Sequence, residues 1–130
     1  LYPMIYRFLL HNSFPPGPLF LKKMRGFWDV IRNIKFPLRN IHKEQTLESI
    51  LSLFPDKQFV LMGDNTQHDL LIYLQAAEKF PNNIRYIIIR KVIKRNEDQV
   101  LISKNIDKLM AANIKLYYAD HFPSLSEAVI

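Results

Sequence analysis

Two short apolar segments constrain the fold of this chain more than any other feature. Residues 59–62 are continuously apolar and end at Gly63, and residues 84–89 form a second apolar run. Short runs of this kind are typical of strands that are buried on both faces of a parallel sheet. We therefore predict two buried, parallel strands at these positions.

Segments with helical periodicity flank both predicted strands. Leu47, Ile50, Leu51 and Phe54 recur at the spacing of one helix face within residues 43–54. Helical spacing and capping residues also predict helices over residues 1–12, over 70–80, between Ser103 and a left-handed Asn113, and after a capping box of Ser124 and Glu127. Shorter apolar runs predict strands at residues 19–21 and 114–118.

This alternation of helices and strands predicts the fold class. Helices and strands in turn, joined by short loops, form α/β proteins in which a mostly parallel sheet is flanked by helices, as in Rossmann-like folds. The length of 130 residues suits one domain, and neither an internal repeat nor a linker divides the chain. We expect a single domain over residues 1–130.

The distribution of charge favours anionic partners. Eighteen basic and 12 acidic residues give a net charge of +6. Residues 23–42 interleave basic with aromatic and aliphatic side chains, so this insertion is either a basic amphipathic helix on an anionic membrane or a lid that packs on the core. A second basic cluster spans residues 90–95. No recognised motif supports nucleic-acid binding, so no nucleic-acid partner is expected.

The absence of cysteine excludes a disulfide scaffold and thiolate chemistry. No apolar run approaches the length of a transmembrane helix, and no secretory signal pattern is visible. We expect a soluble or peripheral membrane protein, cytoplasmic rather than secreted.

The strongest chemical signal follows the first buried strand. Asp64 and Asp69 flank a turn after Gly63. In open parallel sheets, ligands bind at the carboxyl ends of the strands, which is where this turn is expected. Two carboxylates at such a place suit Mg²⁺, which takes oxygen ligands and keeps several waters. The alternative is that Asp64, Asn65 or Thr66 simply caps the next helix. His68 lies in the same turn, and Lys43 opens the preceding helix, either to neutralise a phosphoryl group or as a solvated lysine.

The order of these features resembles the second half of a haloacid dehalogenase superfamily domain. In that pattern a lysine, here Lys43, precedes the fourth strand, and a Gly-Asp-x-x-x-x-Asp motif, here residues 63–69, follows it. The chain is most similar to the catalytic domain of the actin-patch-protein type of phosphatidate phosphatase, through residues 1–3, 14–21, Gln67-His68, Tyr73, Phe80-Pro81 and 87–90.

The resemblance implies roles for individual residues. Asp64 and Asp69 would bind Mg²⁺, and Lys43 would stabilise the charge of an aspartyl-phosphate and of its transition state. Lys22, Asn65 and His68 would contact the substrate, although the family usually has arginine and serine at the positions of Lys22 and Asn65. The substrate would be a phosphomonoester, namely phosphatidate at a membrane surface.

The nucleophile of this mechanism is missing from the chain. It requires two aspartates spaced two residues apart, and no two of the seven aspartates here have that spacing. The resemblance therefore implies a partial domain without its first two strands, whose parent is a phosphatase and which is inactive alone. The alternative is a non-catalytic α/β module that binds a phosphorylated ligand or a protein partner.

Overall fold

The computed structural model describes residues 2–20 and 41–121, which fall into two compact units, Leu1–His42 and Lys43–Ile130. The predicted insertion over residues 23–42 lies almost wholly outside the described residues, as do Lys22 and the capping box of Ser124 and Glu127. The single partial domain stays a prediction.

The first unit contains helix α1, Tyr2–His11, which confirms the predicted N-terminal helix. The helix ends at His11, and Ser13, two residues further on, has a left-handed φ of 56°. The amide of Phe14 donates to the carbonyl of Leu9 at 3.0 Å, and that of Ser13 donates to Leu10 at 3.1 Å, which is the hydrogen-bond pattern of a Schellman motif. The predicted strand at 19–21 is not present at residues 19–20, and residue 21 lies outside the description.

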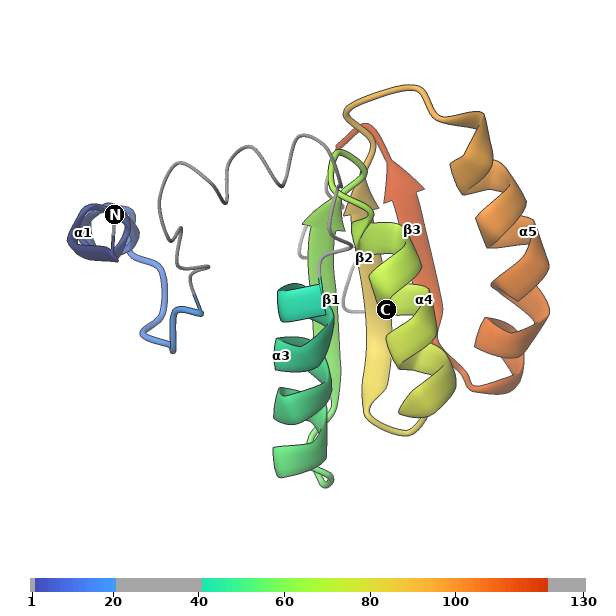
Figure 1. Cartoon of the computed structure of the whole chain (residues 1–130), viewed down its shortest axis with the longest axis horizontal. Helices are drawn as coiled ribbons and strands as arrows, with labels where there is room; N and C mark the ends of the chain where they lie inside the picture. Colours follow the sequence, from blue (N-terminus) through green and yellow to red (C-terminus); the bar gives the residue numbers. More distant parts are fainter. Residues whose placement is uncertain (1, 21–40, 122–130) are drawn as a thin grey trace. The chain divides into compact units, whose positions relative to one another are not determined.

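The second unit is built on a parallel sheet of three strands, β1 (Phe59–Asp64), β2 (Ile84–Arg90) and β3 (Lys115–Ala119), in the order β1-β2-β3. All three predicted strands after residue 42 are present, and the α/β fold class is confirmed. The predicted burial of both faces is wrong for β1, because Val60 is 52% and Met62 54% exposed, whereas both faces of β2 are largely buried. Because the strands are parallel, their carboxyl ends meet at one edge of the sheet, the upper edge in Figure 1.

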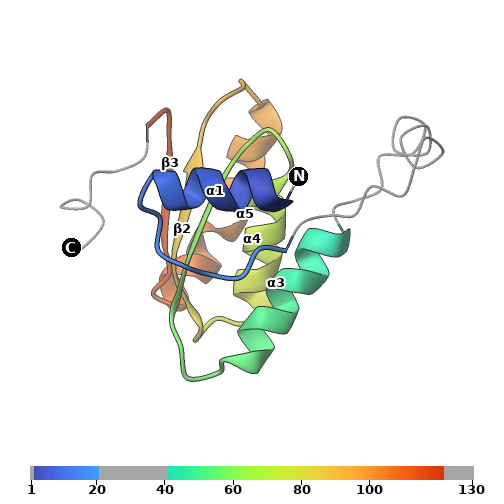
Figure 2. The ribbon, with the colours of Figure 1, turned by 90° about the vertical axis from the view of Figure 1, so that its left-hand side faces the viewer.

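Three helices lie on the same face of this sheet: α3 (Ile41–Leu53), α4 (Asp69–Lys79) and α5 (Asn96–Ala111). Figures 1 and 2 show them side by side over the strands. The side chains between helices and sheet form the core, which includes Leu51, Leu61, Leu70, Leu74, Ile87, Ile89, Leu109 and Ile114. The helices therefore cover one face of the sheet, and the loops that follow β1 and β2 form its carboxyl edge.

A buried asparagine joins α3 to the start of β2. The amide of Asn83 donates to three carbonyls that follow α3, those of Phe54 (3.3 Å), Pro55 (2.7 Å) and Lys57 (3.2 Å). These bonds give donors to the carbonyls of Pro55 and Lys57 and a second donor to that of Phe54, which also accepts from the amide of Lys57 at 3.1 Å. The helix that carries Lys43 is thereby fixed against the sheet.

The predicted start of α5 at Ser103 is wrong. The helix begins at Asn96, seven residues earlier, and Ser103 lies inside it with its hydroxyl donating to the carbonyl of Val100. Acidic residues in the first turn, Glu97 and Asp98, favour this earlier start through the helix dipole. The predicted left-handed Asn113 is confirmed, with a φ of 55°.

Among the described residues, no helix is long and apolar enough to cross a membrane.

Candidate functional site

The carboxyl edge of the sheet gathers the predicted site residues. Asp64 is the last residue of β1, and in the register of the sheet it lies opposite Arg90, the last residue of β2. The turn from Asn65 to His68 then leads into α4, whose first residue is Asp69. Strand β1 thus ends, and helix α4 begins, with a carboxylate at this edge.

Asp64 is held as an anion. Its Oδ1 accepts hydrogen bonds from the backbone amide of Thr66, at 2.8 Å, and from the hydroxyl of Thr66. These two bonds lower the pKa of Asp64 below its ordinary value, and the positive charges of Arg90 and Lys43 act in the same direction. Because Asp64 is also partly exposed, it offers an ionised carboxylate to a ligand at the edge.

Asp69 is a buried partner of Lys43. Its Oδ1 lies 2.5 Å from the Lys43 Nζ, and the side chain of Asp69 is 6% exposed whereas that of Lys43 is 41% exposed. The other face of the Asp69 carboxylate lies against Gly63, where an added Cβ would come within 2.3 Å of Oδ2. The Asp69 carboxylate therefore fixes the position of the Lys43 ammonium, while the side chain of Lys43 remains accessible from solvent.

Tyr73 supports this pair from below. Its hydroxyl donates to the carbonyl of Met62 at 2.8 Å, and the Lys43 Nζ lies 6.0 Å from the centre of its ring. Burial raises the pKa of Tyr73, and the negative charges of Asp69 and Asp64 raise it further. Tyr73 thus stays neutral, and its hydrogen-bonded ring lies beside the Lys43 ammonium.

Asn65 points into the protein. It is 2% exposed, and its Oδ1 accepts from the amides of Val92 (2.8 Å) and Ile93 (3.1 Å). Its Nδ2 donates to the carbonyl of Ile93 at 2.6 Å and lies 3.0 Å from both the Asp98 Oδ2 and the Tyr118 hydroxyl. The amide is fully engaged, so the structure gives Asn65 a structural role, and no polar atom of its side chain is available to the substrate contact expected from the sequence.

The partners of Asn65 form a polar network that sequence reasoning missed. The Tyr118 hydroxyl donates to the buried carboxylate of Asp98 at 2.7 Å. Burial and the neighbouring Asp98 raise the pKa of Tyr118 to about 12, so the hydroxyl stays a donor at neutral pH. Reading Asn96–Asp98 as an acidic helix start would have placed Asp98 at this edge of the sheet.

The alternative reading of the acidic turn, as a simple helix cap, is not what the structure shows. The N-cap of α4 is His68, in a left-handed conformation (φ 59°) and without a side-chain capping bond. Asp64 and Thr66 bond to each other, and Asn65 bonds to the loop after β2. The imidazole of His68 is exposed and borders a hollow of about 230 Å³ with Arg95 and Asp98.

Asp64 and Asp69 are the carboxylates at this edge that the sequence assigns to a magnesium ion. Among the described residues, no group of three or more His, Cys, Asp or Glu side chains could hold a metal. Magnesium, however, is commonly held by one or two carboxylates, with water and substrate phosphate completing its shell. The ionised, partly exposed Asp64 fits that requirement, whereas Asp69 is buried and already paired with Lys43.

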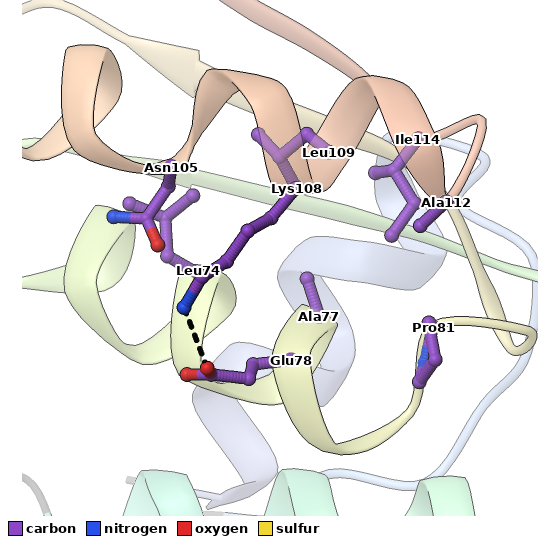
Figure 3. A pocket seen from close by; sticks show the side chains of 9 residues that line it. All are labelled: Leu74, Ala77, Glu78, Pro81, Asn105, Lys108, Leu109, Ala112 and Ile114. Atoms are coloured by element: carbon purple, nitrogen blue, oxygen red, sulfur yellow. Dashed lines mark hydrogen bonds and ion pairs between the residues drawn. The ribbon is translucent and has the colours of Figure 1, made fainter.

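A second hollow lies at the opposite edge of the sheet, between α4 and α5 (Figure 3). Leu74, Ala77 and Leu109 line it, and an ion pair between Glu78 and Lys108, with 2.7 Å between Oε1 and Nζ, lies beside it. Its walls are apolar, and its charged groups neutralise each other on the surface. It offers none of the chemistry that the carboxyl edge assembles.

Comparison with known proteins identifies the family. The catalytic domain of phosphatidate phosphatase APP1 matches residues 1–91, and the chain belongs to this family. It is 44% identical to phosphatidate phosphatase APP1 of Saccharomyces cerevisiae over 78 residues, and 34% identical to an uncharacterized protein of Schizosaccharomyces pombe over 94 residues. These matches cover 60% and 72% of this chain. No solved structure matches it significantly.

The chain corresponds to a small part of these relatives. The matched segments cover 13% of the first relative and 15% of the second. The resemblance to the actin-patch-protein type of phosphatidate phosphatase is therefore confirmed for the catalytic-domain family. The residues beyond 91, which include Asp98 and Tyr118, lie outside the family match.

The structure brings together three of the six predicted site residues: Lys43, Asp64 and Asp69. His68 lies at the rim of the same turn, Asn65 is turned inward, and Lys22 lies outside the described residues. The roles assigned to these residues stay predictions. The sequence reasoning gave no role to Arg90, whose position opposite Asp64 depends on the strand register.

Proposed function

We propose that this chain carries the magnesium- and lysine-bearing half of a phosphatase site that hydrolyses a phosphomonoester, with phosphatidate as the substrate. The family supports a phosphatase, and the name of the yeast relative supports phosphatidate. The observation that carries the proposal is the placement of the Lys43–Asp69 pair beside the ionised Asp64 at the carboxyl edge of a parallel sheet.

Each residue has a distinct task in this proposal. Asp64 binds Mg²⁺, which when present neutralises phosphoryl oxygens as charge develops on them. Lys43 directs its ammonium at the same phosphoryl group and stabilises the transition state electrostatically. Asp69 is a positioning residue, because its buried carboxylate fixes the ammonium and lies against Gly63. As a direct ligand of the metal, Asp69 remains an expectation from the sequence.

The nucleophile is proposed to come from outside these 130 residues. The mechanism forms an aspartyl-phosphate by attack of a carboxylate on phosphorus, with departure of the alcohol, and water then hydrolyses the intermediate. The chain has no pair of aspartates spaced two residues apart to perform the first step. We therefore expect the isolated chain to release no phosphate, and the full-length protein to release phosphate only with Mg²⁺.

Substitution of Lys43 tests this assignment. In the full-length protein, Lys43→Met should lower magnesium-dependent release of phosphate from phosphatidate by a factor of about 100 to 1000, which is typical for loss of one electrostatic stabiliser of the transition state. Lys57→Met is the matched control, because Lys57 is an exposed lysine of the turn that precedes β1. Circular dichroism establishes that both variants fold. Equal turnover of the two variants would contradict the role of Lys43.

A further inference from the structure

The loop that joins β2 to α5 combines exposed apolar side chains with a cluster of cations. Residues 91–95, here named the edge loop, read Lys-Val-Ile-Lys-Arg, and Arg90 precedes them. Val92 is 49% exposed and Ile93 is 40% exposed, although both are large aliphatic residues. Two neighbouring aliphatic side chains in water, with basic residues on either side, are the composition of a segment that enters an anionic membrane surface.

The backbone of the edge loop is held in place from beneath. Asn65 bonds to the amides of Val92 and Ile93 and to the carbonyl of Ile93, and the amide of Lys91 donates to the carbonyl of Ala119 at 2.7 Å. A loop anchored in this way presents its two apolar side chains without losing conformational entropy when it binds. Because Asn65 directly follows Asp64, the same side chain ties the loop to the candidate site.

The charges around the loop favour an anionic surface. Lys91 and Lys94 are exposed, and Arg95 is partly exposed, with its Nη2 3.3 Å from the carbonyl of Thr66. The Lys91 Nζ lies 3.8 Å from the Asp120 Oδ1 in an exposed ion pair that salt and solvent weaken. The cations therefore remain able to exchange these contacts for lipid phosphates.

We infer that the edge loop is the membrane-docking element of this domain: Val92 and Ile93 enter the headgroup region of an anionic bilayer while Lys91 and Lys94 bind its phosphates. A bilayer suits the loop better than a protein partner, because two aliphatic side chains among cations are too few for the apolar centre of a protein interface. Docking here would bring the carboxyl edge, with Asp64 and Lys43, onto the plane in which a lipid phosphate lies. The choice of lipid substrate rests on the proposed function, whereas docking itself does not.

Vesicle flotation with the full-length protein tests this inference. The probes are phosphatidylcholine vesicles with and without phosphatidylserine. We expect salt-sensitive binding to the anionic vesicles only, and we expect Val92→Ser/Ile93→Ser and Lys91→Gln/Lys94→Gln each to weaken it by about tenfold or more. The matched controls are Val100→Ser/Ile106→Ser, on exposed positions of α5, and Lys57→Gln/Lys104→Gln, which should bind as the wild type does.

Turnover measurements separate docking from catalysis. The Val92→Ser/Ile93→Ser variant should lose hydrolysis of phosphatidate in vesicles but keep hydrolysis of a water-soluble phosphomonoester. Asp64→Asn should lose hydrolysis of both substrates but retain vesicle binding. Persistence of turnover in Asp64→Asn would refute the proposed function alone. Undiminished vesicle binding by the Val92→Ser/Ile93→Ser variant, or equal losses in its α5 control, would overturn the docking inference.

Discussion

Gly63 shows how one small residue sets the geometry of the site. The carboxylate of Asp69 occupies the space that a side chain at position 63 would need. The spacing of glycine and aspartate in the motif is therefore a packing requirement as well as a chemical one. The glycine allows α4 to start close enough to β1 for Asp69 to reach Lys43.

The substitution Gly63→Ala should therefore disturb both stability and activity. A Cβ within 2.3 Å of the Asp69 Oδ2 must displace the carboxylate and strain its pair with Lys43. We expect a loss of about 2 kcal/mol in the free energy of unfolding, as in other overpacked sites, and a marked loss of turnover. Urea unfolding measures the first effect. Gln75→Gly, at a partly exposed position inside α4, is a control that should cost about 1 kcal/mol through helix propensity and leave the Lys43–Asp69 pair in place.

Asn65 is the second residue whose side chain decides local structure. Asn65→Ala would remove the acceptor of two backbone amides and one donor to the buried Asp98. We expect the free energy of unfolding to fall by about 3 kcal/mol, because buried polar groups lose their partners. Asn105→Ala, which loses one bond to the carbonyl of Leu101, should cost no more than about 0.5 kcal/mol since alanine favours the helix. Equal losses in the free energy of unfolding for the two variants would contradict a stabilising role of the network around Asn65.

Among the elements, α5 has one end that is easy to predict from the sequence and one that is not. Its C-terminal end is a Schellman motif, in which the amide of Ile114 donates to Leu109 at 2.9 Å and that of Asn113 donates to Met110 at 3.0 Å. The N-terminal end has no side-chain cap at Arg95. Asparagine before an apolar strand is a strong local signal, whereas the start of α5 has only the weaker signal of acidic residues in its first turn.

These boundaries make a paired prediction. Ser103→Ala should leave stability unchanged or raise it by about 0.5 kcal/mol, because Ser103 lies inside the helix, where alanine is preferred. Asn113→Val should cost about 1 to 2 kcal/mol, because a β-branched residue disfavours a φ of 55°. Thermal unfolding followed by circular dichroism measures both. A loss of about 1 kcal/mol in Ser103→Ala, as expected for a removed N-cap, would contradict the observed helix start.

The elements also show what could be predicted from the sequence. The positions of strands β1 and β2 and of helices α3 and α4 follow directly from local sequence patterns, but the exposure of Val60 and Met62 on one face of β1 does not. The isolated strand at residues 19–20 does not form in the described structure, and an apolar run of three residues has no stable strand without a neighbour to pair with. The partners of Asn65 depend on how β3 and α5 pack against β1, which is a tertiary property.

For the whole molecule, the site lies where three independent features coincide. The parallel sheet places the carboxylates at one edge, α3 brings Lys43 to it, and the edge loop adds exposed cations and aliphatic side chains. Motif spacing could predict the first two, because Lys43, Asp64 and Asp69 stand at fixed distances along the chain. The exposure of Val92 and Ile93 could not be predicted, because an isolated apolar pair in sequence is as compatible with burial as with docking.

The most direct measurement of the central claim is magnesium-dependent phosphate release by the Asp64→Asn variant of the full-length protein. The substitution preserves shape but removes the anion that the hydrogen bonds of Thr66 maintain. We predict that turnover of phosphatidate falls by at least about 100-fold while the fold is retained. Asp56→Asn, at an exposed aspartate before β1, should retain full activity. Wild-type turnover by Asp64→Asn would contradict the assignment of this edge as the catalytic site.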